Sequence, residues 1–144
     1  MEMDFDTNLE NLLKELDKEF NISAKKRIVA IDDDRDVLKL LKNILGETYD
    51  ITPMANGMMA VNYFKSKTAD LILLDYEMPM MSGAEVLKKL RENPNTQNIP
   101  VVFLTSVSDN AKVMEIMSLG VNGYILKPIN VDRLRSDLRK ILGK

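Results

Sequence analysis

Residues 27–34 read Arg-Ile-Val-Ala-Ile-Asp-Asp-Asp, an apolar run that ends in three consecutive carboxylates. An apolar run of this length predicts a short strand that is buried on both faces of a sheet. Similar runs occur at 71–74, 100–104 and 123–126, and a weaker one covers 49–52. The chain therefore contains five candidate strands.

The segments that follow these runs have apolar residues at helical spacing. Their apolar positions are Val37, Leu38, Leu41, Ile44 and Leu45; Met59, Ala60, Tyr63 and Phe64; Ala84, Val86, Leu87 and Leu90; Val113, Met114, Met117 and Leu119; and Val131, Leu134, Leu138, Ile141 and Leu142. A strand followed by a helix, repeated five times, predicts a parallel sheet with helices on both faces. We expect an α/β, doubly wound three-layer fold over 26–144.

Residues 1–25 precede this repeat and form a separate segment, which we expect to be an amphipathic helical extension. Thr7 and Glu10 are spaced as a helix-starting capping box. One helical stripe contains Leu9, Leu12, Leu13, Leu16 and Phe20. Because the five-fold repeat does not need this helix, the stripe must cover the domain, pair with a second copy as a homodimer, or bind a partner.

Composition excludes several kinds of function. The 144 residues, 45% of them hydrophobic, suffice for one globular domain. The 20 basic and 22 acidic residues give a net charge of −2, so direct nucleic-acid binding is not expected. The chain has no Cys and no His, which excludes disulfides, thiolate nucleophiles and imidazole bases. The sequence contains no signal core or membrane span, and we expect a cytoplasmic protein.

Polar residues follow four of the predicted strands. Asp32 and Asp33 come after the first, Asp75 after the third, Thr105 after the fourth and Lys127 after the fifth. Because the carboxyl ends of parallel strands meet at one edge, where ligands of open α/β sheets bind, we expect these side chains to converge.

The convergence of three carboxylates predicts a metal site. Two unit charges 4 Å apart repel by about 1 kcal/mol in water and by more near a protein surface. A divalent cation removes this repulsion, and oxygen ligands favour Mg²⁺, with Mn²⁺ as a substitute. Asp75 is then placed to attack phosphorus as a nucleophile, while Lys127 and Thr105 hold the phosphoryl oxygens.

Each of these residues also has an ordinary structural explanation. Asp34 is best explained as the N-cap of the helix that begins at Arg35. Thr105 could cap the helix that follows it, and Lys127 could be a solvated surface lysine. The joint occurrence at four strand ends favours the functional interpretation over these explanations.

Four stretches match one known family. Besides 27–34, residues 70–83 read Asp-Leu-Ile-Leu-Leu-Asp-Tyr-Glu-Met-Pro-Met-Met-Ser-Gly, residues 100–106 read Pro-Val-Val-Phe-Leu-Thr-Ser, and residues 120–128 read Gly-Val-Asn-Gly-Tyr-Ile-Leu-Lys-Pro. Over about residues 25–143 the chain resembles the receiver domain of two-component response regulators, a CheY-like fold. The resemblance implies a five-stranded parallel sheet in the order 2-1-3-4-5.

The resemblance also implies roles for individual residues. Asp75 would accept phosphate from a sensor histidine kinase or a histidine phosphotransfer protein. Asp33 and the main-chain carbonyl of Glu77 would join Asp75 on Mg²⁺, and Asp32 would assist through water. Lys127 and Thr105 would keep the phosphate-binding roles argued above.

Three further expectations rest on the same resemblance. The Lys127-Pro128 peptide bond would be cis, which is chemically reasonable only before proline. Thr105 and Tyr124 would form a switch that changes the face of the fourth and fifth helices of the repeat and the fifth strand. A downstream protein target would bind that face, while the chain would catalyse only its own phosphorylation and dephosphorylation.

Two other functions compete with this interpretation. Hydrolases with an Asp nucleophile also combine an Asp, a Thr or Ser, a Lys and Mg²⁺. These hydrolases resemble one another in having a second Asp two residues after the nucleophile, where this chain has Glu77. A receiver-like module could also bind partners without phosphorylation, although all the expected site residues are present.

Overall fold

A computed structural model of the chain describes residues 5–20 and 25–143. Five parallel strands form one sheet in the order β2-β1-β3-β4-β5, which confirms the predicted fold class. The strands are β1 (Arg27–Ile31), β2 (Asp50–Met54), β3 (Leu71–Asp75), β4 (Val101–Thr105) and β5 (Gly123–Leu126).

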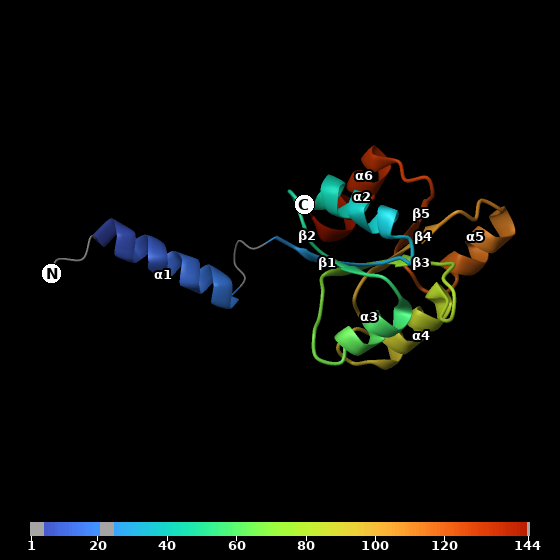
Figure 1. Cartoon of the computed structure of the whole chain (residues 1–144), viewed down its shortest axis with the longest axis horizontal. Helices are drawn as coiled ribbons and strands as arrows, with labels where there is room; N and C mark the ends of the chain where they lie inside the picture. Colours follow the sequence, from blue (N-terminus) through green and yellow to red (C-terminus); the bar gives the residue numbers. More distant parts are fainter. Residues whose placement is uncertain (1–4, 21–24, 144) are drawn as a thin grey trace.

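Helices cover both faces of the sheet (Figure 1). On one face lie α2 (Arg35–Leu45) and α6 (Val131–Leu142), and on the other lie α3 (Gly57–Tyr63), α4 (Gly83–Glu92) and α5 (Asn110–Met117). Successive strand residues point to opposite faces, so Ile28 and Ala30 pack in the α2 and α6 core while Val29 and Ile31 pack in the other. Two apolar layers thus hold the sheet between the helices.

Local signals explain where several elements begin. Asp34 caps α2, as predicted, by accepting a hydrogen bond from the Asp36 N–H at 2.9 Å. The capping box predicted at Thr7 is wrong, because α1 (Phe5–Phe20) already includes that residue. The second strand extends past the predicted 49–52 to Met54 and includes Pro53. Proline is tolerated there because β2 lies at the edge of the sheet.

The apolar side of α5 is more exposed than its sequence pattern predicts. Met114 and Met117 are 73% and 40% exposed, and Leu119, just beyond the helix, is 39% exposed. Ile116 is the α5 residue that is buried in the core. The helix therefore turns part of its apolar surface to solvent.

The first helix, α1, stands apart from the sheet and its covering helices in Figure 1. Three leucines of its predicted stripe, Leu9, Leu12 and Leu13, are exposed. The division into an extension over 1–25 and a receiver over 26–144 stays a prediction. Within the described residues, no helix has the length and apolar character needed to cross a membrane.

Candidate functional site

The strand register places the predicted site residues at one edge of the sheet. Asp75 is the last residue of β3 and pairs with Leu104, and Thr105 is the last residue of β4 and pairs with Leu126. Asp32 follows β1 directly, and Lys127 follows β5. The four strands therefore end in four polar side chains at neighbouring positions.

Three carboxylates form a cluster at this edge. One oxygen from each of Asp32, Asp33 and Asp75 lies within 4.8 Å of the other two. Asp32 and Asp75 are buried, with 0% and 3% of their surface exposed, whereas Asp33 is exposed. Two carboxyl groups are thus held away from water, and the third faces it.

The cluster has few hydrogen-bond donors. The Asp34 N–H donates to Asp32 Oδ1 at 2.9 Å, and the Glu77 N–H donates to Asp75 Oδ1 at 3.3 Å. The buried Asp32 Oδ2 accepts no hydrogen bond of good geometry, although the Lys127 ammonium lies beside it. A buried carboxylate oxygen needs a positive or hydrogen-bonding partner, and the ammonium at 2.8 Å is the one that this oxygen has.

Lys127 supplies positive charge to the cluster. Its Nζ lies 2.8 Å from Asp32 Oδ2 and 3.3 Å from Asp75 Oδ1, and its side chain is 23% exposed. The Lys127 N–H donates to the Thr105 carbonyl at 2.8 Å, which fixes the backbone after β5. The peptide bond to Pro128 is cis. A single ammonium thus bridges the two buried carboxylates.

Thr105 lies beside this group and is completely buried. Its Oγ1 accepts a hydrogen bond from the Val107 N–H at 3.0 Å, so the hydroxyl proton remains free to donate to a ligand. Tyr124 is on the adjacent strand β5, where it pairs with Phe103 and is half-buried.

The pKa of Asp75 is raised from 3.8 to about 7. Burial is the main cause, and the negative charge of Asp32 and a hydrogen bond with Asp33 add to it, while Lys127 opposes it. In the absence of a cation, this carboxylate is therefore only partly ionised at neutral pH.

The pKa of Lys127 is also raised. Burial acts to lower it, but contacts with Asp32 and Asp75 together outweigh the burial effect. The lysine is consequently charged at neutral pH.

These residues fit a hard divalent cation. Their ligand atoms are carboxylate oxygens, which Mg²⁺ prefers, and a buried Asp32 oxygen lacks a well-aligned donor. The exposed position of Asp33 leaves one side of the cluster open to water and to a ligand. The convergence of Asp32, Asp33 and Asp75 is present as expected, while the binding of Mg²⁺ by these residues stays a prediction.

Gly83 is a site residue that sequence reasoning missed. A Cβ at this position would lie 2.4 Å from the Asp75 carbonyl oxygen and 2.8 Å from the Tyr76 Cα. The Gly83 N–H also donates to the Tyr76 carbonyl at 2.9 Å. The start of α4 therefore packs directly on the backbone that presents Asp75. The sequence signals that a helix starts here, because Ser82 is a good N-cap. It does not indicate how closely Gly83 approaches the Asp75 backbone.

We expect Gly83→Ala to lower the free energy of unfolding by about 1–3 kcal/mol, because the added methyl group collides with fixed backbone. Gly123→Ala is the matched control, since a Cβ there meets nothing within 4 Å. It should change stability by less than about 0.5 kcal/mol. Urea unfolding of both variants measures the difference, and equal stabilities would contradict the packing described for Gly83.

Comparison with known proteins identifies the family. The family model for the response regulator receiver domain matches residues 28–139. The chain belongs to this family. Receiver domains act as signalling switches that interact with histidine kinases and downstream effectors, and not as enzymes that turn over a separate substrate.

Individual relatives agree with this assignment. The receiver is 30% identical to chemotaxis protein CheY-3 of Vibrio cholerae over 85% of this chain and 96% of that protein. It is 35% identical to a probable cyclic di-GMP phosphodiesterase of V. cholerae over 76% of this chain, but it spans only 25% of that protein's length.

A solved structure has the same fold. The receiver domain of sensor histidine kinase PA1611 from Pseudomonas aeruginosa, solved with a magnesium ion in its active-site cleft, aligns with a TM-score of 0.76. The alignment covers 84% of this chain and 100% of that domain at 24% identity, so the likeness concerns the fold.

Proposed function

We propose that this receiver accepts a phosphoryl group on Asp75 from a phosphohistidine of a sensor histidine kinase or a histidine phosphotransfer protein. The observation that supports this most directly is the cluster of Asp32, Asp33 and Asp75 with Lys127 at 2.8 and 3.3 Å. Asp32 shares the burial and the contact with Lys127, but Asp75 is the last residue of β3, the middle strand of the sheet.

The transfer itself needs no general base. An oxygen of the ionised Asp75 carboxylate forms a bond to phosphorus while the phosphorus–nitrogen bond of the donor breaks. The products are an acyl phosphate on Asp75 and a neutral imidazole once its nitrogen takes up a proton from water. Positioning and charge stabilisation supply the catalysis.

The chain's own residues hold the incoming phosphoryl group. We assign Lys127 to one of its oxygens, because the ammonium already touches Asp75 Oδ1. We assign the Thr105 hydroxyl to another, because its proton is free to donate. Asp33, Asp75 and the Glu77 carbonyl would hold Mg²⁺, with Asp32 acting through water. Mg²⁺ held there would supply positive charge that offsets the negative charge of the transferred group.

We further propose that phosphorylation changes the face formed by α5, β5 and α6. Thr105 ends β4, and Tyr124 lies on the adjacent β5, so a movement of the Thr105 hydroxyl toward phosphate would alter the space beside Tyr124. A downstream protein would read this change. Thr105 and Tyr124 would thus link the phosphate acceptor to the face formed by α5, β5 and α6.

Intact-mass measurement after incubation with a small phosphodonor tests the proposal. With Mg²⁺ present, we expect the chain to gain the mass of one phosphoryl group. With a chelator in place of Mg²⁺, the gain should disappear, because the buried carboxylates then repel the phosphoryl oxygens and each other. No gain with any phosphodonor would leave the chain a binding module only.

A further inference from the structure

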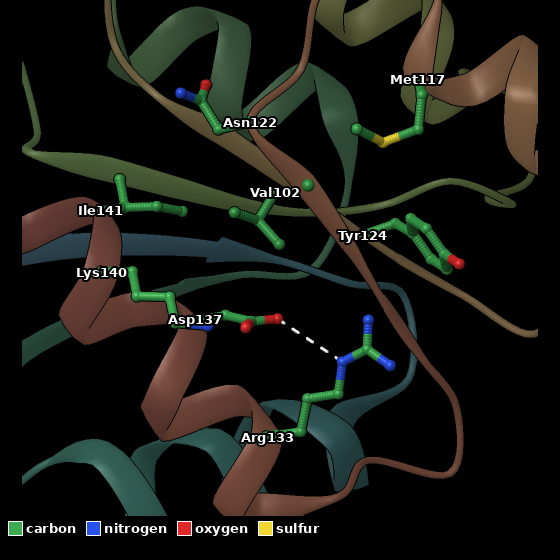
Figure 2. Close-up of a pocket in the computed structure, with 9 residues that line it drawn as sticks. Val102, Met117, Asn122, Tyr124, Arg133, Asp137, Lys140 and Ile141 are labelled. Carbon is green, nitrogen blue, oxygen red and sulfur yellow. Dashed lines mark ion pairs between the residues drawn. The ribbon is translucent and has the colours of Figure 1, made fainter.

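A groove opens at the β5 edge of the sheet between α5 and α6, with a volume of about 280 Å³ (Figure 2). Val102 and Tyr124 come from the strands, Met117 comes from α5, and Ile141 comes from α6. These side chains are mainly apolar, and Met117 is 40% exposed. The groove is therefore an apolar surface that the described part of the domain leaves open.

The α6 side of the groove is basic. Arg133 and Lys140 are exposed there, and the acidic Asp137 lies between them. Arg133 Nε is 3.6 Å from Asp137 Oδ2, an exposed pair that contributes little to stability (Figure 2). Two positive groups against one negative group leave this rim with a net positive charge.

The first helix has the complementary properties. Leu9, Leu12 and Leu13 are spaced to share one side of α1, and they are 44%, 51% and 56% exposed. Residues 1–20 contain seven acidic and two basic residues, a net charge of −5, whereas residues 21–144 have a net charge of +3. The chain thus contains both an acidic helix with an exposed apolar stripe and an apolar groove with a basic rim.

We propose that α1 docks its leucine stripe into the groove between α5, β5 and α6 of its own chain. Exposed leucines in a row need a cover, and the groove offers apolar contacts to them and positive charge to the acidic side of the helix. This proposal concerns surface complementarity and does not depend on the phosphoacceptor role of Asp75.

Charge argues against the main alternative, in which α1 pairs with α1 of a second copy. Such pairing would bring together two segments that each have a net charge of −5. It would also rest on a helix of 16 residues, which is short for a stable two-stranded coil. The groove, in contrast, attracts the same charge that opposes the pairing.

The connection between α1 and β1 is long enough for docking within one chain. Across the sheet, three strand spacings separate β1 from β5, a distance of about 14 Å. Along the strands, Gly123 lies level with Ala30, which is about 10 Å from Arg27. The direct distance is therefore about 17 Å. Seven residue steps from Phe20 to Arg27 can span up to about 25 Å.

The tether also favours this docking over docking on a second copy. A connection of only a few residues gives the helix an effective concentration in the millimolar range at a site that it can reach. Dilute protein in solution offers a second copy at far lower concentration. At low protein concentration, the groove of the same chain should therefore be filled first.

Disulfide trapping tests the proposal in the full chain, which has no native cysteine. The variant with Leu12→Cys and Met117→Cys places one thiol on the stripe and one in the groove. The control pairs Leu12→Cys with Met58→Cys. Met58 is 62% exposed and lies on α3, which follows β2, the outermost strand on the side of the sheet opposite β5. All three positions are exposed, so both variants should fold.

Under mild oxidation of dilute protein, we expect a monomeric disulfide in the first variant at roughly ten times the yield of the control, because the tethered helix is held at the groove. A predominantly dimeric disulfide would show docking between copies and would overturn the proposal. Equal yields in the two variants would also overturn it. Neither result would bear on phosphorylation at Asp75.

Hydrogen exchange provides a second measurement without cysteines. If α1 is docked, the backbone amides of residues 9–16 should exchange roughly tenfold more slowly in the unmodified chain than in the variant with Arg133→Glu and Lys140→Glu. This variant reverses the charge of the rim. The variant with Lys88→Glu and Lys89→Glu makes the same charge change on exposed positions of α4 and should retain the protection. Equally fast exchange in all three proteins would contradict the docking.

Discussion

Asp75→Asn should abolish phosphoryl incorporation and at the same time stabilise the folded chain. The amide cannot form the acyl phosphate, so the mass gain expected for the unmodified chain should be absent. The stabilisation follows from the pKa of Asp75, which burial and the nearby Asp32 charge raise to about 7. When a carboxyl group ionises less readily in the folded chain than in the unfolded chain, the folded chain loses stability at every pH where the unfolded chain has the group ionised.

The sign of this effect determines its pH dependence. An unfolded chain ionises Asp75 near its ordinary pKa of 3.8, and the folded chain does so only near 7. The folded state therefore loses stability as the pH rises between these values and loses no more above them. Replacement by Asn should raise the free energy of unfolding by about 2 kcal/mol at pH 8 and hardly at all at pH 4.

Chemical unfolding without divalent cations at the two pH values measures the effect. Asp34→Asn is the control, because Asp34 is exposed and Asn caps a helix as well as Asp does. The control should take up phosphate normally and keep its stability within about 0.5 kcal/mol. An equal gain for Asp75→Asn at pH 4 and pH 8 would contradict the electrostatic explanation.

Lys127→Met should slow phosphoryl transfer by about 10²–10³-fold, the usual effect of removing one donor to a developing anion. Methionine retains the length of the side chain but removes the ammonium that lies 2.8 Å from Asp32 Oδ2 and 3.3 Å from Asp75 Oδ1. The acidic cluster then loses its nearest positive partner. Its affinity for Mg²⁺ should rise, because the metal no longer competes with the lysine.

The two measurements together separate a catalytic role from a structural one. If Lys127 only held the site together, its removal would weaken Mg²⁺ binding as well as transfer. Phosphorylation rates and a magnesium titration can be compared with those of Lys112→Met, a substitution at an exposed position on α5. A rate within threefold of the unmodified chain would contradict the assignment of Lys127 to the phosphoryl group.

The positions of the main site residues could be predicted because they depend on topology. In a parallel sheet, the residue after each buried strand lies at the same edge, so finding the strands located Asp32, Asp75, Thr105 and Lys127. The four short apolar runs marked these strands clearly. The fold class and the convergence of these residues therefore followed from the sequence.

Features that depend on three-dimensional packing were not predictable in the same way. The close approach of Gly83 to the Asp75 carbonyl arises from how α4 begins over the end of β3. The bridging of two carboxylates by Lys127, and the donor that Asp32 Oδ2 lacks, depend on distances that spacing does not reveal. Of these features, the contact with Lys127 lowers the pKa of Asp75, against the larger effects of burial and the Asp32 charge.

Helix surfaces gave the least reliable predictions. The apolar spacing around Met114 and Met117 is the pattern of a buried stripe, but α5 lies near the edge of the sheet and buries only Ile116 there. In α1, Thr7 has the sequence of a cap, yet the helix begins at Phe5. Apolar spacing shows that a face needs cover, but it does not identify what covers it.

Locating the phosphoryl group in the sequence shows whether Asp75 is the acceptor. After phosphorylation with a small phosphodonor and Mg²⁺, borohydride reduces an acyl phosphate of aspartate to homoserine, which peptide mass mapping can place in the sequence. We expect homoserine at residue 75 and at no other aspartate. Homoserine at position 32 or 33, or a phosphate that resists reduction on Thr105, would contradict it.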